Sequence, residues 1–367
     1  MKATVSEFGH RLFHEWQHLL LPQLGASVIV AVSGGADSVA LLLAVDELKR
    51  AGLISIEIVV AHLDHCLRCD STSDAEWVLA LSNELGVANV SEKIDVGRLA
   101  QTTSDNIEQA ARLARYDFFE RAALSVRSAH VLTAHTMDDQ AETVLMRLVR
   151  GSGLDGLAGM LAARPLSPTS NVSLVRPMIS WARRTDTERF CIHNGRDFRV
   201  DSMNEEESYA RIKVRKQILP LLKELNPKYA ENISRASQLC REASVSLSEM
   251  AANLLHKAMT AGISSLGNAD DATTVRDRNF GLSVSVLVGA PSDARRRAIM
   301  LWLRRENGDL RRIERVHIQA VERLLRDGRG GRVAELPGGF SVETRKGRLF
   351  LRVRQNATAI PGEKRDL

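Results

Sequence analysis

Apolar residues follow two different periods along the first two hundred residues of the chain. Short runs rich in Val, Ile and Ala predict buried strands, whereas longer segments with apolar residues every three or four positions predict helices. Strands that alternate with helices at this spacing form a parallel sheet covered on both faces, so we predict an α/β, doubly wound fold. The predicted strands span residues 28–32, 54–61, 88–94, 130–134 and 173–178, and the predicted helices span 38–51, 73–85, 107–124 and 138–150.

The pattern changes after residue 222. Residues 227 to about 327 have helical periodicity, interrupted by the stretch TAGISSLGNADDATT, which predicts a loop. The segment 332–353 alternates polar and apolar residues around two turns that contain glycine, which predicts a small β-hairpin. We therefore expect an α/β domain over 1–222 with a lead-in helix over 1–24, a helical domain over 223–330, a small β element over 331–354 and a frayed tail over 355–367.

The stretch VIVAVSGGADSVALLLA, residues 28–44, places two glycines where a predicted strand meets a predicted helix. Gly34 and Gly35 have no Cβ, so backbone N–H groups and the helix N-terminus can face an anion there. The loop lacks the lysine of the GxxxxGK[ST] motif and the third glycine of the GxGxxG motif. Its serines can hydrogen-bond phosphate, and Asp37 beside a phosphate indicates Mg²⁺, which binds through one or two carboxylates plus phosphates. The alternative is a simple turn in which Asp37 caps the helix.

The segment SGGADS resembles the pyrophosphate loop, S-G-G-x-D-S, of the N-type ATP pyrophosphatases, which split ATP into AMP and pyrophosphate while they adenylate a substrate oxygen. Five further segments occur in the order and spacing of the tRNA(Ile)-lysidine synthetases. This resemblance covers about residues 25 to 225, and the rest of the chain resembles that family only in general character. The segments are HLDHCLRCDSTSDAEWV, NIEQAARLARYDFF, TAHTMDDQAETVLMRLVRGSGLDGLAGM, RPMISWARR and DSMNEEESYARIKVRKQILPLL.

The resemblance implies a PP-loop ATP pyrophosphatase domain, of the adenine nucleotide α-hydrolase-like fold, over residues 1–222 and a tRNA-binding helical domain after it. It implies a cytoplasmic ligase that joins L-lysine to position 2 of the wobble cytidine in the CAU anticodon of tRNA(Ile). ATP would be converted to AMP and pyrophosphate through an adenylated cytidine, and a homodimer is expected. The ATP-binding residues it implies are Ser33, Gly34, Gly35, Ala36, Asp37, Ser38, His62 and His135, with Asp37 also on Mg²⁺.

Two acids stand three residues apart at the start of a predicted helix. Asp139 and Glu142 therefore share one helix face, which follows directly after a predicted strand. Such a pair suits a lysine ammonium, with one carboxylate as general base. The resemblance supports both acids as lysine-binding and catalytic, joined by Arg211, which can pair with a carboxylate or a phosphate. The alternative is that acids in a first helical turn complement the helix dipole.

Arg112 and Arg115 lie three residues apart on another predicted helix. We interpret them as contacts to ATP or tRNA phosphates, with Arg112 catalytic beside the activated intermediate and Arg115 binding tRNA. The alternative for this pair is an exposed face paired with acids. His135, at the end of a predicted strand, either contacts the nucleotide or packs in the core.

Positive charge is concentrated late in the chain. The net charge is +5, yet residues 295–332 contain twelve arginines against five acidic residues. A local excess of this size is typical of polyanion binding, and we assign tRNA phosphate contacts to Arg304, Arg305, Arg311 and Arg312. The alternative is a solvated helical surface.

The chain has four cysteines, too few for a disulfide framework, so we predict a reducing compartment and the cytoplasm. No stretch approaches the roughly 18 apolar residues of a membrane span, and we predict no membrane partner. Cys66 and Cys69 stand where the family pattern has glycines, and Ile212 where it has asparagine. A Cys-x-x-Cys spacing leaves tRNA 2-thiolation through a metal or iron–sulfur cluster as the rival function, although a lone pair is a weak metal signal. An inactive tRNA-binding relative is the third possibility.

Overall fold

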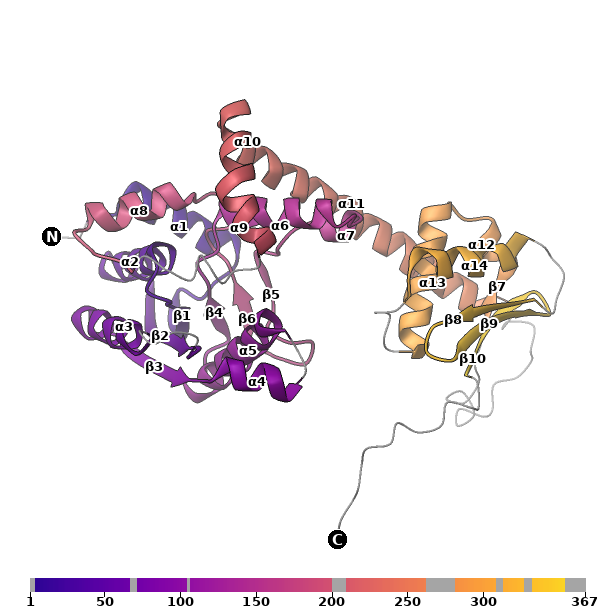
Figure 1. Cartoon of the computed structure of the whole chain (residues 1–367), viewed down its shortest axis with the longest axis horizontal. Helices are drawn as coiled ribbons and strands as arrows, with labels where there is room; N and C mark the ends of the chain where they lie inside the picture. The colour runs from indigo at the N-terminus through magenta and orange to yellow at the C-terminus, as the bar shows by residue number, and fades with distance from the viewer. Residues whose placement is uncertain are drawn as a thin grey trace, which may run out of the picture. The chain divides into compact units, whose positions relative to one another are not determined.

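The computed structural model describes residues 4–66, 71–103, 106–199, 209–261, 281–307, 313–326 and 332–353. The chain divides into two compact units, Met1–Arg241 and Glu242–Leu367 (Figure 1). The predicted tail over 355–367 lies outside the described residues. Within the described residues, no helix has the length and apolar character needed to cross a membrane.

Unit 1 is built on one six-stranded sheet with the order β3-β2-β1-β4-β6-β5. Neighbouring strands from β3 to β6 are parallel, and β5 joins the edge antiparallel to β6. The sheet confirms the predicted α/β fold, to which the structure adds the edge strand β5. The strands are β1 (Leu24–Ala31), β2 (Ser55–Asp64), β3 (Ala88–Lys93), β4 (His130–Leu132), β5 (Ala163–Pro165) and β6 (Ser173–Val175).

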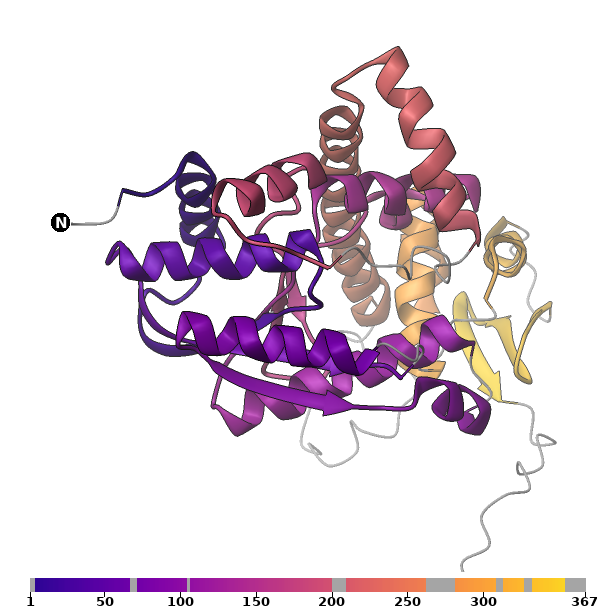
Figure 2. The same cartoon turned by 60° about the vertical axis from the view of Figure 1, so that its left-hand side comes forward.

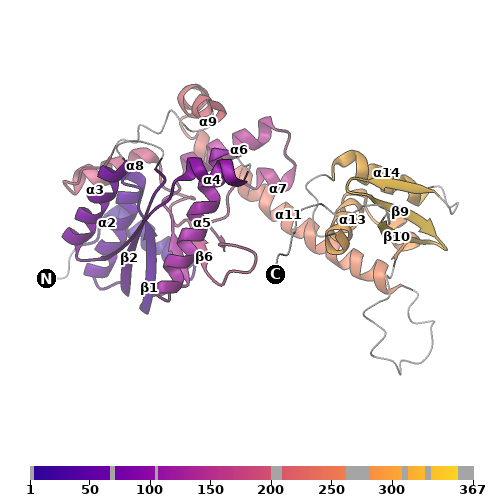
Figure 3. The ribbon, with the colours of Figure 1, turned by 60° about the horizontal axis from the view of Figure 1, so that its bottom comes forward.

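Helices cover both faces of this sheet (Figure 3). The four helices predicted over residues 38–150 are found with ends that move by at most two residues, the lead-in helix predicted over 1–24 is shorter, at Glu7–His18, and further helices are added. They are α1 (Glu7–His18), α2 (Ala36–Arg50), α3 (Ser71–Leu85), α4 (Val96–Thr103), α5 (Ile107–Ser125), α6 (Met137–Val149), α7 (Leu154–Leu157), α8 (Arg184–His193), α9 (Tyr209–Lys213), the π-helical turn η2 (Val214–Ile218), α10 (Leu219–Leu225) and α11 (Tyr229–Thr260).

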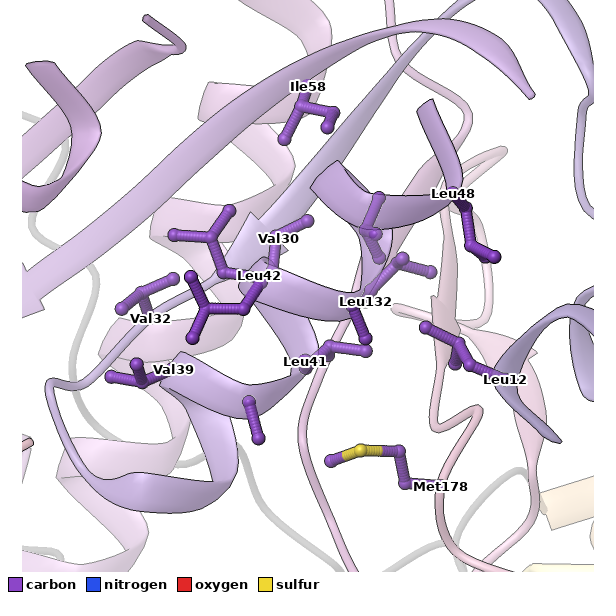
Figure 4. Packing of buried hydrophobic residues seen from close by; sticks show 14 of the residues in the cluster. Leu12, Val30, Val32, Val39, Leu41, Leu42, Leu48, Ile58, Leu132 and Met178 are labelled. Carbon is purple, nitrogen blue, oxygen red and sulfur yellow. The ribbon is translucent and has the colours of Figure 1, made fainter. Parts of the chain in front are cut away.

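Alternation along β1 explains why both faces are covered. Val28 and Val30 pack in one cluster with residues of α1, α2 and α8, whereas Ile29 packs in another with Phe118 and Phe119 of α5. Figure 4 shows part of the first cluster, in which apolar side chains of α2 and of the strands pack together. Complete burial of each such side chain stabilises the fold by about 1.5–3 kcal/mol, so the sheet is a rigid support.

The sheet order determines where a ligand can bind. β1 pairs with β2 on one side and with β4 on the other, and the chain reverses its direction of winding between them. In open parallel sheets, ligands bind outside the carboxyl ends of the strands at such a switch point. The glycine loop follows β1 and the helix with the two acids follows β4, so both lie at this edge.

Unit 2 combines helices and strands around one core. Its antiparallel sheet has the order β7-β10-β9-β8, so the predicted β element over 332–353 forms three strands of a larger sheet, β8, β9 and β10 (Figure 1). Trp302, Ile318 and Leu349, from two helices and a strand, belong to the same buried cluster. The elements are β7 (Leu282–Ser283), α12 (Val284–Val288), α13 (Ser292–Asn307), α14 (Arg315–Arg326), β8 (Val333–Leu336), β9 (Phe340–Arg345) and β10 (Arg348–Val353), after the last turns of α11. Figure 2 gives a second view of these elements.

Candidate active site

The glycine loop, Ser33–Ser38, is shaped by its own backbone and serines. Gly34 has φ +94°, a left-handed conformation that favours glycine, and a Cβ there would lie 3.4 Å from Cγ of Arg199. The Ser38 hydroxyl accepts a hydrogen bond from the Ser33 amide at 3.1 Å and donates one to the Gly35 carbonyl at 2.9 Å. Because α2 begins directly after Gly35, the loop presents a helix N-terminus and open backbone to an anion.

Asp37 lies in the first turn of α2. It accepts a hydrogen bond from the Thr187 hydroxyl, and its Oδ2 is 3.9 Å from Nε of Arg184. Burial and the nearby Asp139 carboxylate raise the pKa of Asp37 to about 6. Among the described residues, no three His, Cys, Asp or Glu side chains are grouped as metal ligands. Asp37 therefore fits Mg²⁺ only as a single carboxylate ligand, with phosphates and water completing the shell.

The two predicted histidines lie near the ends of β2 and β4, the two strands that flank β1. His62, at the end of β2, is 5% exposed and shares a 2.8 Å hydrogen bond between Nδ1 and the Val32 carbonyl, which assigns the proton to Nδ1. Its Nε2 is a buried acceptor without a hydrogen-bond partner among the described residues. His135, after β4, lies 3.1 Å from the Thr133 hydroxyl through Nδ1, and burial lowers its pKa to about 3. The His135 ring is therefore neutral at physiological pH.

Asp139 forms a capping box with Thr136 at the N-terminus of α6. Its Oδ2 accepts hydrogen bonds from the Thr136 amide at 2.8 Å and the Thr136 hydroxyl at 3.0 Å. Its Oδ1 accepts a 2.6 Å hydrogen bond from Nη2 of Arg184. Burial opposes ionisation, but Arg184, His135 and the Thr136 amide outweigh it and hold the pKa of Asp139 well below its usual range. The carboxylate is thus ionised in the folded protein.

Glu142, one helical turn further on, is completely buried and surrounded by arginines. Its Oε1 is 2.9 Å from Nη1 of Arg184 and 2.8 Å from Nε of Arg215. Its Oε2 is 3.2 Å from Nε of Arg211 and 3.1 Å from Nη2 of Arg215. The structure therefore brings Arg211 to the predicted acid as a direct ion pair. Asp139 and Glu142 are called the acid pair below.

The third acid of this helix, Asp138, has a different role. It accepts hydrogen bonds from Nε of Arg183 at 3.0 Å, from the Arg184 amide at 2.9 Å and from the Tyr229 hydroxyl at 3.1 Å. These contacts tie the starts of α6, α8 and α11 together. Asp138 therefore fixes the backbone from which Arg184 extends.

Arg112 and Arg115 lie on the exposed side of α5. The Arg112 guanidinium stacks on the Tyr116 ring at 5.0 Å, and the Arg164 guanidinium stacks on the same ring at 4.9 Å. Nη2 of Arg115 is 3.3 Å from Nε2 of His65. Within the described residues, neither arginine forms an ion pair with the acid pair, so their assignment to phosphates or to the intermediate stays a prediction.

Two pairs of arginines on α13 have different surroundings. Arg295 and Arg296 both bind the buried Glu322 of α14, at 3.1 Å and 2.8 Å. Arg304 and Arg305, in the last turn of α13, are exposed. The other two arginines predicted to bind tRNA, Arg311 and Arg312, lie outside the described residues.

Cysteine chemistry receives little support from the geometry. The Cys66 amide donates a 2.8 Å hydrogen bond to Oδ1 of Asp64, and burial together with Asp64 raises the pKa of its thiol. Cys191 is buried in α8, and burial raises its pKa to about 12, so it is a neutral thiol. Cys69 lies outside the described residues.

Sequence reasoning missed three residues of the site, namely Arg184, Thr187 and Arg215. Arg184 lies in the segment RPMISWARR and Arg215 in YARIKVR, both of which the sequence analysis quoted without assigning these positions. The spacing of Arg211 and Arg215, i and i+4, was a signal that both lie on one helical face. For Arg184 the sequence has no such signal, because its partners lie 42 or more positions away along the chain.

Two family models match the chain. A PP-loop domain matches residues 10–222, and a TilS substrate binding domain matches residues 282–350. A tRNA(Ile)-lysidine synthase of Leifsonia xyli subsp. xyli is 36% identical over 323 residues, which cover 88% of each chain. A tRNA(Ile)-lysidine synthase of Geobacillus kaustophilus is 33% identical over 93% of this chain and 68% of its own length. The chain spans 55% to 59% of the length of several other curated relatives that it matches.

The fold also resembles that of a solved structure. U34-tRNA thiolase NcsA from Methanococcus maripaludis, determined with its [4Fe-4S] cluster, matches 64% of this chain and 78% of its own with a TM-score of 0.53. The two sequences are 15% identical, so this similarity concerns the fold alone.

Proposed function

Because the chain belongs to the tRNA(Ile)-lysidine synthase family, we propose that it uses ATP to join L-lysine to position 2 of the wobble cytidine in the CAU anticodon of tRNA(Ile). One observation carries the assignment of the site. Arg184 faces Asp37 of the glycine loop and both members of the acid pair, so a nucleotide site and an amine site are contiguous. An enzyme that adenylates one substrate and then adds an amine to it requires that arrangement.

The first step activates the cytidine. The glycine loop binds the ATP phosphates through its backbone and serines, and Nε2 of His62 accepts a hydrogen bond from the nucleoside. The cytidine carbonyl oxygen attacks the α-phosphorus, the bond to the β-phosphate oxygen breaks, and pyrophosphate leaves. Mg²⁺ on Asp37 would supply charge neutralisation for the phosphates. The product is a cytidine whose oxygen carries AMP, which is a far better leaving group than oxide.

The second step adds lysine. A free lysine amine has a pKa near 10.4, so only about one molecule in a thousand is neutral near pH 7.4. The acid pair binds the ammonium beside the activated carbon, where the low pKa of Asp139 keeps its carboxylate ionised. An ammonium has no lone pair, so it first passes one proton to a neighbouring carboxylate or to water, and the neutral amine then attacks the activated carbon. As the C–N bond forms, the C–O bond to the adenylate breaks and AMP leaves. Arg112 is assigned to the charge of the departing AMP.

The partners and compartment follow from the same proposal. Arg304 and Arg305 of unit 2 contact tRNA phosphates, which position the RNA without reading its sequence. The described cysteines Cys66, Cys191 and Cys240 are free thiols, in keeping with a cytoplasmic enzyme. A homodimer and the absence of a membrane partner stay predictions.

The two rival functions have less support. Thiolation needs several thiolates around a metal or cluster, and the described cysteines form no such group. An inactive relative would be expected to lose the glycine loop or the acid pair first, and both are intact in this chain.

The test is lysine transfer with purified protein, CAU-anticodon tRNA(Ile), ATP and labelled lysine. We expect label in the tRNA, matched by AMP and pyrophosphate, and a loss of about 100-fold or more in Asp139→Asn. Asp117→Asn, an exposed acid on α5, is the control and should retain activity. Release of AMP without lysine in the tRNA would contradict the proposed acceptor.

A further inference from the structure

Glu142 has no hydrogen-bonding capacity left for a ligand. A carboxylate offers about four acceptor positions, two on each oxygen. Oε1 is occupied by Arg184 and Arg215, and Oε2 by Arg211 and again by Arg215, at distances between 2.8 and 3.2 Å. A lysine ammonium can therefore bind Glu142 only after one guanidinium has moved away.

The charges of the site are already balanced as well. Asp37 and the acid pair provide three negative charges, and Arg184, Arg211 and Arg215 provide three positive charges. An incoming ammonium would add an uncompensated positive charge to a largely buried cluster, which is costly. ATP brings the negative charge that reverses this balance.

Arg184 differs from the other two arginines in where its nitrogens lie. Nη1 and Nη2 bind one member of the acid pair each, and Nε lies 3.9 Å from Asp37 beside the glycine loop. Arg215 also reaches both acids, with Nη2 at 3.9 Å from Oδ1 of Asp139, but it binds both oxygens of Glu142 through a bidentate fork from η2 and forms no ion pair with Asp37 among the described residues. Of the three cations, Arg184 is the one placed between the amine site and the phosphate site.

We propose that Arg184 occupies the amine site in the nucleotide-free enzyme and moves to the ATP phosphates when nucleotide binds, so that lysine binds tightly only after ATP. Arg184 is thus a positioning residue that couples the two substrates, and the inference rests on the proposed function. In the structure the Arg184 nitrogens lie 2.6 Å from Oδ1 of Asp139 and 2.9 Å from Oε1 of Glu142. When Arg184 moves away, each of these oxygens regains one acceptor position. An ammonium placed there would replace one cation by another.

This order of binding has a chemical benefit. Lysine that bound before ATP would face a cytidine that is not yet adenylated. It would occupy the acid pair without being able to react. Because Arg184 leaves the acid pair only for the ATP phosphates, lysine can bind there only when ATP, which supplies the adenylyl group, is already bound. Thermodynamic linkage requires that lysine, in turn, strengthens ATP binding by the same factor.

Calorimetry on the full-length wild-type protein tests the coupling directly. Lysine is titrated into the protein alone and into protein saturated with Mg²⁺ and α,β-methylene-ATP, which cannot be cleaved at the reacting bond. We expect at least tenfold tighter lysine binding with the nucleotide. Equal affinities, within twofold, would overturn the inference.

Variants test whether Arg184 carries the coupling. In Arg184→Gln, lysine should bind with the same affinity whether or not the nucleotide is present, because no cation has to leave. Arg189→Gln, an exposed arginine on the same helix, is the matched control and should keep the wild-type ratio. A wild-type ratio in Arg184→Gln would overturn the assignment.

Arg184→Lys keeps the test decisive if the glutamine variant does not fold. A single ammonium cannot fork across both carboxylates, so the ratio should fall below that of the wild type, and an unchanged ratio would contradict the inference. The transfer assay separates the two proposals. Lysidine formation without coupling overturns only the role of Arg184, whereas absence of both lysine binding and lysine transfer overturns the proposed function as well.

Discussion

Unit 1 and unit 2 each bury a glutamate among arginines, yet the two arrangements differ in kind. Glu142 has a side chain that is 0% exposed, and its arginines come from α8, α9 and η2. Glu322 is 8% exposed and binds the consecutive residues Arg295 and Arg296 of a single helix. The first cluster contains further carboxylates and lies at the strand ends, whereas the second joins α13 to α14.

The difference indicates how to separate a functional ion cluster from a structural one. A single carboxylate that satisfies two neighbouring donors completes its own hydrogen bonding and needs no ligand. The cluster around Glu142 joins several acids and several arginines from distant segments beside the glycine loop. Its positive and negative charges are balanced, and a charged ligand would change that balance. We therefore expect substitutions of Glu142 to affect activity most and substitutions of Glu322 to affect stability most.

The largest expected effect is on catalysis in unit 1. Glu142→Gln preserves shape but removes the charge that holds an ammonium, so lysine transfer to tRNA should fall by about 100-fold or more. Steady-state transfer assays with labelled lysine measure this loss, and circular dichroism verifies that the variant is folded. Near-wild-type transfer would show that the two glutamates do not differ in function.

Glu322→Gln should show the opposite profile. It leaves the Arg295 guanidinium, which is 16% exposed, without its carboxylate, and we expect a loss of about 1–3 kcal/mol in the stability of unit 2. Thermal unfolding measures the shift, while ATP consumption in unit 1 should stay unchanged. A fall in ATP turnover without a fall in Tm would contradict the structural role.

A smaller effect is expected at the glycine loop. Gly34→Ala forces a Cβ into a backbone with φ +94°, which costs about 1–3 kcal/mol and distorts the anion site. We expect ATP binding to weaken by about tenfold. Gly86→Ala is the matched control, because its φ is +67° and nothing lies within 4 Å of the added Cβ, so it should affect stability alone. Equal ATP affinities in both variants would exclude a phosphate role for the loop.

The smallest effect is expected on the surface of unit 2. Arg304→Glu combined with Arg305→Glu should raise the KM for tRNA several-fold and reduce the slope of log affinity against log salt by about 1.5. Filter binding over a range of salt concentrations measures the slope. The control, Lys49→Glu with Arg50→Glu at the exposed end of α2 distant from the glycine loop, makes the same change in charge. An identical slope in the two double variants would refute the tRNA contact.

The sequence by itself determined five strands of unit 1, the four helices predicted over 38–150 and the position of the glycine loop. Hydrophobic periodicity is a local property, and β1, the glycine loop and α2 follow one another without interruption, so their structure could be inferred from neighbouring residues. The i and i+3 spacing of the acid pair likewise placed both acids on one face of α6. The two-residue strand β7 escaped prediction because its partner β10 lies 65 or more positions away, whereas β5 pairs with the nearby β6 and is too short to show a period of its own.

Only the tertiary structure decided what surrounds the acid pair. Arg184, Arg211 and Arg215 are separated from Glu142 by 42 to 73 positions, and no local pattern records such a distance. Their convergence depends on β1 and β4 being neighbours, on α8 packing against α2, and on Asp138 fixing the start of α8. Charged side chains are brought together in a low-dielectric environment by the packing of the elements that carry them, and that packing is a property of the whole unit and not of any one segment.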